Sequence, residues 1–206
     1  MVRIKICGLT DLDAANAAIQ AGADAIGFVF TKSKREISPE RARTIISALP
    51  PYVTTVGVFV DEDLDRLNEI TNYCRLDAVQ LHGAESPDYC TKTIRSAIKA
   101  IKVREANDLA AIDDYKQVVQ GILLDTYVQG ATGGTGHPFP WEYASIAHEK
   151  AAIILAGGLH VNNVEEAIRK VHPYAVDVSS GVETNGVKDS FKMREFINRV
   201  RCCNQN

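Results

Sequence analysis

Eight short runs rich in β-branched and other apolar residues recur along the chain, and their spacing constrains the fold more than any other feature. Successive runs begin about 20–30 residues apart, which is the room that one strand, one helix and two short connections require. Amphipathic segments fill the intervals. The runs are Val2–Ile6, Ala25–Phe30, Thr54–Val60, Ala78–Leu81, Ala97–Val103, Val118–Leu124, Ala152–Leu155 and Ala175–Val178.

The intervening segments carry signals for helices. Ser38–Glu40 and Ser86–Asp88 each place a capping hydroxyl before a proline at the first helical position, followed by an acid near the positive helix end. Asn162 and Glu165 resemble a capping box for a later helix. Apolar residues recur on one side of the segment Leu64–Cys74. Each predicted helix is therefore apolar on one face, which must cover another element.

Strands that alternate with helices predict a parallel sheet with right-handed crossovers. An open doubly wound sheet would carry a glycine-rich fingerprint after its first strand, with an acid about 20 residues later. The turn Cys7–Thr10 is no such fingerprint. We therefore predict an α/β fold, a single (β/α)8 TIM barrel of near-minimal length over residues 1–206, with a frayed tail at 201–206.

The first predicted strand places polar side chains inside the barrel. Because side chains alternate along a strand, Ile4 and Ile6 would face the helices while Arg3, Lys5 and Cys7 face the interior. This inward column ends in a thiol at the carboxyl end of the strand, where barrel active sites lie. Cys7 is either an inert buried thiol or a reactive one whose thiolate Lys5 favours.

Polar residues and glycines end several other predicted strands. Asp125 follows an apolar run and is a candidate general acid, with a helix cap or an ion pair as the alternative. His82 is either a catalyst or a loop hydrogen-bonding group. Lys102 is either a Schiff-base nucleophile or an ion-pair partner. The strand-end residues are Cys7, Asp61, Gln80, His82, Lys102, Asp125, Gly157, Gly158, Ser179, Ser180 and Gly181.

Glycine-rich segments suggest a phosphate site and a lid. Gly157-Gly158 and Ser179-Ser180-Gly181 follow strands seven and eight, whose loops often bind phosphate in barrels; the alternative is that the glycines only permit tight turns. Gly130–Gly136 lacks the lysine and hydroxyl residue that close a Walker loop. It is interpreted either as a tether or as a lid containing Gly133, Gly134 and Gly136.

Composition argues against several functional classes. A net charge of −3 gives no basic excess for nucleic acid. No apolar stretch approaches the roughly 18–20 residues of a membrane span, and no secretory signal is apparent. The five cysteines form no C-x-x-C or Cys/His metal spacing, so we expect neither a disulfide scaffold nor a structural zinc site. The expectation is a reduced, cytoplasmic protein without a metal.

Ordered motifs across nearly the whole chain resemble the phosphoribosylanthranilate isomerase family of tryptophan biosynthesis. Lys5–Thr10 and Val176–Glu183 are its most specific segments, whereas the glycine loops alone would fit many phosphosugar barrels. The other matching segments are Gly22–Phe30, Ser33–Arg35, Val56–Val60, Gln80–Gly83, Leu123–Asp125, Gly133–Gly136 and Ala156–Leu159.

The resemblance implies an Amadori isomerase, an aldose–ketose type of intramolecular oxidoreductase, that needs no cofactor. It implies Cys7 as general base, Asp125 as general acid, and Arg35 as the contact for the anthranilate carboxylate. His82 and Asp177 lie in family motifs and are expected to bind substrate; orienting the ribose is one role open to Asp177. The implied phosphate-binding residues are Gly157, Gly158, Ser179, Ser180 and Gly181.

Some questions stay open at this level. Glu36 departs from the family pattern and would weaken the positive field beside Arg35. The resemblance implies a small phosphosugar as partner, with the chain either a monomer or a homodimer. Two rival functions remain: a Schiff-base phosphosugar aldolase using Lys102 or Lys5, and a barrel that binds a phosphometabolite without catalysis.

Overall fold

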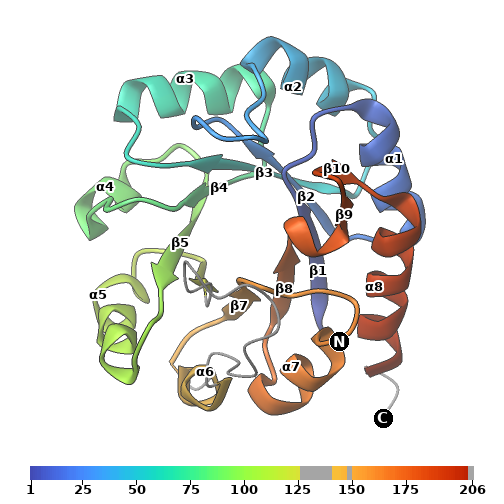
Figure 1. The fold of residues 1–206 in the computed structure, drawn as a ribbon. Coiled ribbons are helices and arrows are strands. Elements are labelled where there is room, and N and C mark those ends of the chain that lie inside the picture. The colour runs from blue at the N-terminus through green and yellow to red at the C-terminus, as the bar shows by residue number, and fades with distance from the viewer. Residues whose placement is uncertain (126–140, 148–149, 204–206) are drawn as a thin grey trace.

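A computed structural model describes residues 1–125, 141–147 and 150–203 of the chain. Eight parallel strands close into a barrel in sequence order, and β1 pairs with β8 to complete it (Figure 1). The closed order confirms the predicted (β/α)8 barrel and excludes the open sheet. The strands are β1 Arg3–Cys7, β2 Ala25–Val29, β3 Thr54–Phe59, β4 Ala78–Leu81, β5 Ser96–Lys102, β6 Gly121–Asp125, β7 Ile153–Ala156 and β8 Ala175–Val178.

Helices surround the barrel on its outside (Figure 1). They are α1 Leu12–Ala21, α2 Pro39–Ser47, α3 Leu64–Cys74, α4 Pro87–Thr91, α5 Ile112–Tyr115, α6 Trp141–Ala147, α7 Val164–Val171 and α8 Ser190–Cys203. Two 3-10 turns, η1 Ala106–Ala111 and η2 Ser180–Val182, and a short hairpin of β9 Glu183–Thr184 and β10 Val187–Lys188 complete the described elements. None of these helices has both the length and the apolar character needed to cross a membrane.

Helix caps form as predicted at two of three positions. The Ser38 hydroxyl accepts from the N–H of Arg41, and the Ser86 hydroxyl from that of Tyr89. The capping box expected at Asn162 and Glu165 is wrong, because α7 begins after Asn163 and has no side-chain cap. The Asn163 side chain instead accepts from the N–H of His160 at 2.8 Å, so it stabilises the preceding turn.

The barrel interior is apolar on one side and polar on the other. Small and branched side chains of β5 to β8 pack together inside: Ala100, Leu123, Ile154, Ala156 and Ala175. On β1, β4 and β8 the interior instead holds Lys5, Gln80 and Asp177, all buried. Ile4 and Ile6 pack in the outer core with the helices, so the predicted parity of the first strand is confirmed.

The last helix extends to Cys203 and is bonded to the start of the chain. Residues 201–203 belong to α8, and the frayed tail at 201–206 stays a prediction. Arg201 donates to Asp24 at 2.8 Å and to the carbonyl oxygens of Val2 and Gly22 at 3.2 and 2.9 Å. These bonds fasten the last turn of α8 to the start of β1 and the end of α1. Residues 204–206 lie outside the described part.

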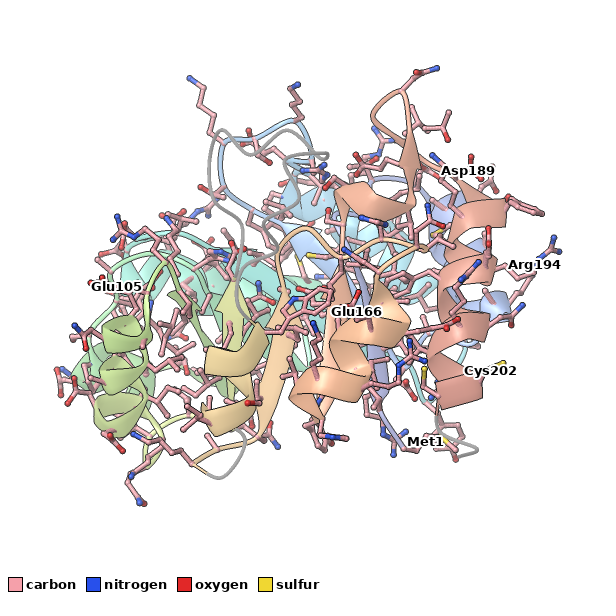
Figure 2. All side chains as sticks on the ribbon, turned by 60° about the horizontal axis from the view of Figure 1, so that its bottom comes forward. Met1, Glu105, Glu166, Asp189, Arg194 and Cys202 are labelled. Atoms are coloured by element: carbon pink, nitrogen blue, oxygen red, sulfur yellow. The ribbon has the colours of Figure 1, made fainter. Side chains whose placement is uncertain are left out.

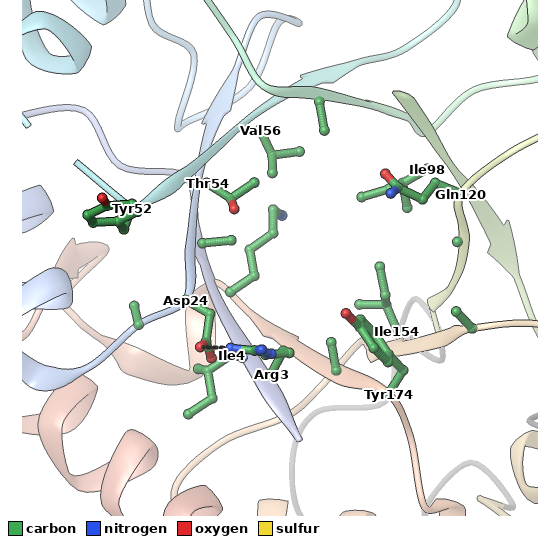
Figure 3. Close-up of a pocket in the computed structure, with 17 residues that line it drawn as sticks. Arg3, Ile4, Asp24, Tyr52, Thr54, Val56, Ile98, Gln120, Ile154 and Tyr174 are labelled. Carbon is green, nitrogen blue, oxygen red and sulfur yellow. Dashed lines mark hydrogen bonds and ion pairs between the residues drawn. The ribbon is translucent and has the colours of Figure 1, made fainter. Parts of the chain in front are cut away.

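A cavity of about 690 Å³ opens at the amino ends of the strands (Figure 3). Small side chains such as Ala25, Ala78 and Ala175 leave this space, and the ion pair between Arg3 and Asp24, at 3.0 Å, lies beside it. Barrel enzymes carry their chemistry at the opposite, carboxyl ends of the strands. This cavity therefore does not identify the active site, although it is large.

A buried ion pair secures the loop that follows β4. The Lys99 ammonium lies 2.7 Å from a Glu85 carboxylate oxygen and 2.6 Å from the carbonyl oxygen of Gly83. The Glu85 carboxylate also accepts from the backbone N–H groups of Asp61 and Gly83, at 2.9 and 3.1 Å. Since both charged side chains are almost fully buried, this loop depends on their pairing.

Replacement of Lys99 by Met should lower the free energy of unfolding by about 3–5 kcal/mol, because it strands the buried Glu85 charge. The double variant Lys99→Met/Glu85→Gln should recover part of that loss. Urea denaturation measures both. Lys92→Met is the matched control, since the Lys92–Asp88 pair is mostly exposed and should cost at most about 1 kcal/mol. Equal losses in the free energy of unfolding for Lys99→Met and Lys92→Met would contradict the inference that the loop depends on the buried ion pair.

Candidate active site

A second cavity, of about 300 Å³, lies at the carboxyl ends of the strands and collects most of the predicted site residues. In the side view of Figure 2, Asp189 marks this mouth end, whereas Met1 and Cys202 mark the opposite end. The predicted residues that line the cavity are Cys7, Arg35, His82, Asp125, Gly157, Gly158, Asp177, Ser179 and Ser180. Residues from six strands or their following loops therefore meet at one site.

Several predicted residues lie elsewhere. Gly181 does not line the cavity; a Cβ atom there would collide with the carbonyl oxygen of Leu159, so this glycine lets the loops after β7 and β8 pack. Lys102 is exposed and also absent from the lining. Asp61 accepts from the backbone N–H of Ala84 at 2.6 Å and so shapes a loop. The predicted lid residues Gly133, Gly134 and Gly136 lie outside the described residues.

Gly27 on β2 makes room for the groups at the end of β1. A Cβ atom at Gly27 would lie 2.8 Å from Sγ of Cys7 and 3.0 Å from Cε of Lys5. Both contacts are shorter than carbon normally allows, so any side chain here would displace the thiol or the lysine. The glycine is thus a packing requirement of the site.

Lys5 is a buried cation with fixed partners. Its Nζ lies 2.9 Å from Asp177 Oδ2 and 3.0 Å from Gln80 Oε1, and the Lys5 and Asp177 side chains are both over nine-tenths buried. Burial alone would lower the pKa of Lys5, but the negative charges of Asp177 and the Cys7 thiolate raise it above its usual value. The amine therefore stays protonated and cannot serve as a nucleophile.

The Cys7 thiol is subject to opposing influences. Burial raises its pKa, the Lys5 ammonium lowers it, and the Asp177 carboxylate raises it again; the net result is a raised pKa. The sequence-based argument that Lys5 favours the thiolate has the right sign, but desolvation outweighs the effect. At neutral pH the resting group is the thiol.

Asp125 is hydrogen-bonded to a histidine at the cavity wall. Its Oδ2 lies 3.1 Å from Nε2 of His82, and both side chains are about four-fifths buried. Nδ1 of His82 in turn lies 3.2 Å from Nε2 of Gln80. The three residues form one connected polar group, so His82 is placed beside the predicted acid and not in an isolated loop.

One buried carboxylate oxygen in the cavity has no protein partner among the described residues. Asp177 Oδ1 is buried and has no hydrogen-bond partner among the described residues, while Oδ2 binds Lys5. An unpaired buried acceptor costs free energy, about 1–3 kcal/mol or more for a charged group. Because Asp177 lines the cavity, a hydroxyl group of a bound ligand can supply the donor.

The loops after β7 and β8 have the backbone expected of an anion site. Gly157 and Gly158 have φ values of 78° and 66°, which favour glycine. The Ser179 hydroxyl donates to the carbonyl oxygen of Cys7 at 3.0 Å, and Nζ of Lys188 lies 3.2 Å from the same hydroxyl oxygen. Lys188 thus adds a buried cation beside the predicted phosphate residues. It lies on β10, beyond the strand ends that the sequence argument considered.

Arg35 is held by a carboxylate that the sequence analysis assigned no role. Its Nε and Nη2 donate to the two carboxylate oxygens of Glu183 at 2.6 and 2.8 Å. Burial alone would raise the pKa of Glu183, but hydrogen bonds from Arg35 and Lys188 lower it. Gly8, with φ of 77°, lies against Arg35, and a Cβ atom there would collide with Cδ. Glu36 is exposed. The carboxylate that binds Arg35 is that of Glu183.

Alkylation of Cys7 by iodoacetamide should report the raised pKa. Because burial disfavours the thiolate, the rate should keep increasing with pH beyond the value of about 8.5 that is usual for a thiol. Mass spectrometry of the Cys7 peptide at a series of pH values measures this rate, with a short unstructured cysteine peptide as control. A Cys7 profile that levels off at lower pH than the control would contradict the assignment.

Comparisons with known proteins agree on one family. Residues 4–199 match the family model described as N-(5'phosphoribosyl)anthranilate (PRA) isomerase. An N-(5'-phosphoribosyl)anthranilate isomerase of Moorella thermoacetica is 52% identical over 202 residues, covering 98% of this chain and 90% of that protein. The crystal structure of phosphoribosyl anthranilate isomerase from Thermotoga maritima superposes with a TM-score of 0.91 at 43% identity, covering 98% of this chain and all of that one.

A related crystal structure contains a ligand. It is a phosphoribosyl anthranilate isomerase in complex with reduced 1-(o-carboxyphenylamino)-1-deoxyribulose 5-phosphate, at a TM-score of 0.89 and 42% identity, covering 98% of this chain and all of that one. The family model extends over residues 4–199, and both solved structures superpose on 98% of this chain. This chain belongs to the N-(5'-phosphoribosyl)anthranilate isomerase family.

Proposed function

We propose that this chain converts N-(5'-phosphoribosyl)anthranilate into 1-(2-carboxyphenylamino)-1-deoxyribulose 5-phosphate, with Cys7 as general base and Asp125 as general acid. The observation that carries the proposal is their position in one cavity of about 300 Å³ with Arg35 and the glycine loop after β7. The related structure with the reduced product bound supports the same substrate class.

The reaction needs one acid and one base. The acid protonates the ring oxygen as the C1'–O bond breaks, and the nitrogen lone pair forms an iminium ion. The base then removes the proton from C2', and the electron pair of the broken C2'–H bond forms the enolamine. A proton adds to C1' while the C2' hydroxyl loses its own, which yields the ketone. The iminium ion itself accepts the electrons. The protonated thiol can return its proton to C1', and the Asp125 carboxylate can take the hydroxyl proton, which restores both groups.

Asp125 is suited to the acid role by its contact with His82. Once it has protonated the ring oxygen, the carboxylate that remains accepts from a histidine nitrogen 3.1 Å away. A charge-assisted hydrogen bond of this kind stabilises the ionised product of proton transfer. Proton transfer by one positioned group typically accelerates a reaction by about 10²–10⁴-fold.

Cys7 is suited to the base role by its position beside a fixed cation. The thiol must ionise before it can take the C2' proton, and its raised pKa opposes this. The Lys5 ammonium, which Asp177 and Gln80 hold in place, lowers the cost of the thiolate. A bound substrate that displaces water would strengthen that attraction.

The remaining cavity residues match the polar groups of the substrate. The phosphate would bind the backbone at Gly157 and Gly158 together with Ser179 and Ser180, near Lys188. Asp177 Oδ1, buried without a partner among the described residues, would accept from a ribose hydroxyl.

Arg35 would bind the anthranilate carboxylate. A guanidinium group has five N–H donors. Two of its nitrogens are bound to Glu183, which fixes the plane of the group while other N–H donors remain to meet the substrate.

The aldolase alternative is poorly supported. Lys5 is buried but held protonated by Asp177, and Lys102 is exposed and outside the cavity, so neither provides a buried neutral amine. Borohydride added during turnover separates the two reactions. We expect no covalent lysine adduct by mass spectrometry; a stable adduct would overturn the proposed mechanism. A cytoplasmic location and a monomeric or homodimeric state stay predictions.

Cys7→Ala and Asp125→Asn should each lower kcat by roughly 10²–10⁴-fold while substrate still binds, because each removes one proton-transfer group. The loss of anthranilate fluorescence measures turnover, and equilibrium titration with the reduced product measures binding. Cys202→Ala is the control, because it removes an exposed thiol at the far end of the barrel. If either site variant retained the wild-type rate, that residue would lose its role.

Arg35→Met should raise KM more than it lowers kcat, because it removes a charge-assisted bond to the substrate carboxylate while leaving the acid and base in place. Initial rates over a range of substrate concentrations separate the two parameters. A substrate lacking the anthranilate carboxylate should discriminate poorly between the variant and the wild type. Unchanged KM and kcat in Arg35→Met would refute the placement.

A further inference from the structure

A continuous series of hydrogen bonds crosses the barrel from the base side to the acid side. Asp177 Oδ2 accepts from Lys5 Nζ at 2.9 Å, and the same ammonium lies 3.0 Å from Gln80 Oε1. Gln80 Nε2 lies 3.2 Å from His82 Nδ1, and His82 Nε2 lies 3.1 Å from Asp125 Oδ2. Gln80 is 2% exposed and stands at the centre of the series.

The Lys5 ammonium determines the direction of every hydrogen bond that follows it in the series. An ammonium group can only donate, so the Gln80 atom beside Lys5 must be the amide oxygen. The amide NH₂ therefore faces His82 and donates to Nδ1, which must carry no proton. A neutral imidazole then carries its proton on Nε2, where it donates to Oδ2 of Asp125 both before and after that carboxyl group gives up its proton.

The opposite tautomer would lose both bonds. With the proton on Nδ1, two donors would face each other across the Gln80–His82 contact. The lone pair of Nε2 would at the same time face Asp125, whose carboxylate has no proton to donate once the acid step has occurred. Both contacts lie in a largely buried site, where such unfavourable pairs are expensive.

The backbone holds this arrangement in register. Gln80 and His82 stand two residues apart at the end of β4, so their side chains lie on the same, inward side. Lys5 reaches Gln80 from β1 across the interior space that Gly27 leaves open. The Lys5–Asp177 ion pair prevents the ammonium from moving elsewhere.

We propose that Gln80 is a positioning residue that locks His82 in its Nε2–H tautomer and thereby keeps an N–H donor on Asp125. Its own orientation is imposed by the Lys5–Asp177 pair, so the ion pair beside the base also orders the acid. The catalytic part of this inference rests on the proposed function, because Asp125 matters to the rate only if it is the acid.

The tautomer can be measured without any turnover. Long-range ¹H–¹⁵N correlation spectra distinguish protonated from unprotonated imidazole nitrogens. The His82→Gln variant identifies the His82 signals among those of the five histidines by deleting them. We expect Nδ1 of His82 to be unprotonated and Nε2 protonated in the wild-type protein near neutral pH. A proton on Nδ1 would overturn the proposal.

Gln80→Glu changes the bond that sets the tautomer. A carboxylate can still accept from Lys5, but its second oxygen now faces His82 Nδ1 as an acceptor and draws a proton there. We expect the Nδ1 resonance to shift to the protonated range. We also expect kcat to fall by roughly 10–100-fold, as for other residues that orient a functional histidine, with KM unchanged. An unprotonated Nδ1 in this variant would overturn the proposal, as would an unchanged kcat in a variant whose Nε2 has lost its proton.

A double-mutant cycle separates this role from a general effect on folding. In His82→Gln the side-chain amide can donate to Asp125 without having a tautomer. Adding Gln80→Glu to that variant should therefore cost much less in kcat than it does in the wild type. The same loss in both backgrounds would show that Gln80 acts independently of His82.

Gln120→Glu is the matched control, because it makes the same chemical change at an exposed position beside the opposite cavity. It should change neither the His82 resonances nor kcat. If the wild-type protein failed to isomerise phosphoribosylanthranilate, the proposed function would be wrong. The spectra would still decide whether Gln80 sets the tautomer.

Discussion

The ion pair between Lys5 and Asp177 inside the barrel is the interaction on which the rest of the site depends. A charge buried in this way is tolerated only when it is paired and hydrogen-bonded. Here the lysine reaches Asp177 at 2.9 Å and Gln80 at 3.0 Å, and Gly27 leaves the space for it. The same ammonium group lies beside the Cys7 thiol and, through Gln80, sets the proton on His82. One buried cation thus influences both the proposed base and the proposed acid.

This arrangement has a cost that its chemistry explains. Burial raises the pKa of Cys7 and leaves one oxygen of Asp177 without a partner among the described residues. A hydrophobic interior of the kind found on β5 to β8 would avoid both penalties. We interpret the polar half of the interior as a surface arranged to meet a substrate, since a sugar hydroxyl that donates to Asp177 Oδ1 would remove the penalty of that unpaired oxygen.

Local patterns in the sequence were sufficient for the barrel and for much of its mouth. The spacing of apolar runs predicts the strands, and strand parity places Lys5 inside, because both depend only on neighbouring residues. The ion pairs that shape the site cannot be found from neighbouring residues. Lys5 with Asp177 and Arg35 with Glu183 are 172 and 148 residues apart, so no local period reveals them. The capping box at Asn162 failed because a neighbouring asparagine binds the preceding turn instead.

We propose that Cys7 and Asp125 together isomerise one aromatic aminosugar phosphate. The most direct measurement is the decay of anthranilate fluorescence when phosphoribosylanthranilate is mixed with the wild-type protein. We expect a loss of fluorescence that is proportional to enzyme concentration, far faster than spontaneous decay, and accompanied by formation of the aminodeoxyribulose phosphate. A decay no faster than that of the substrate alone would contradict it.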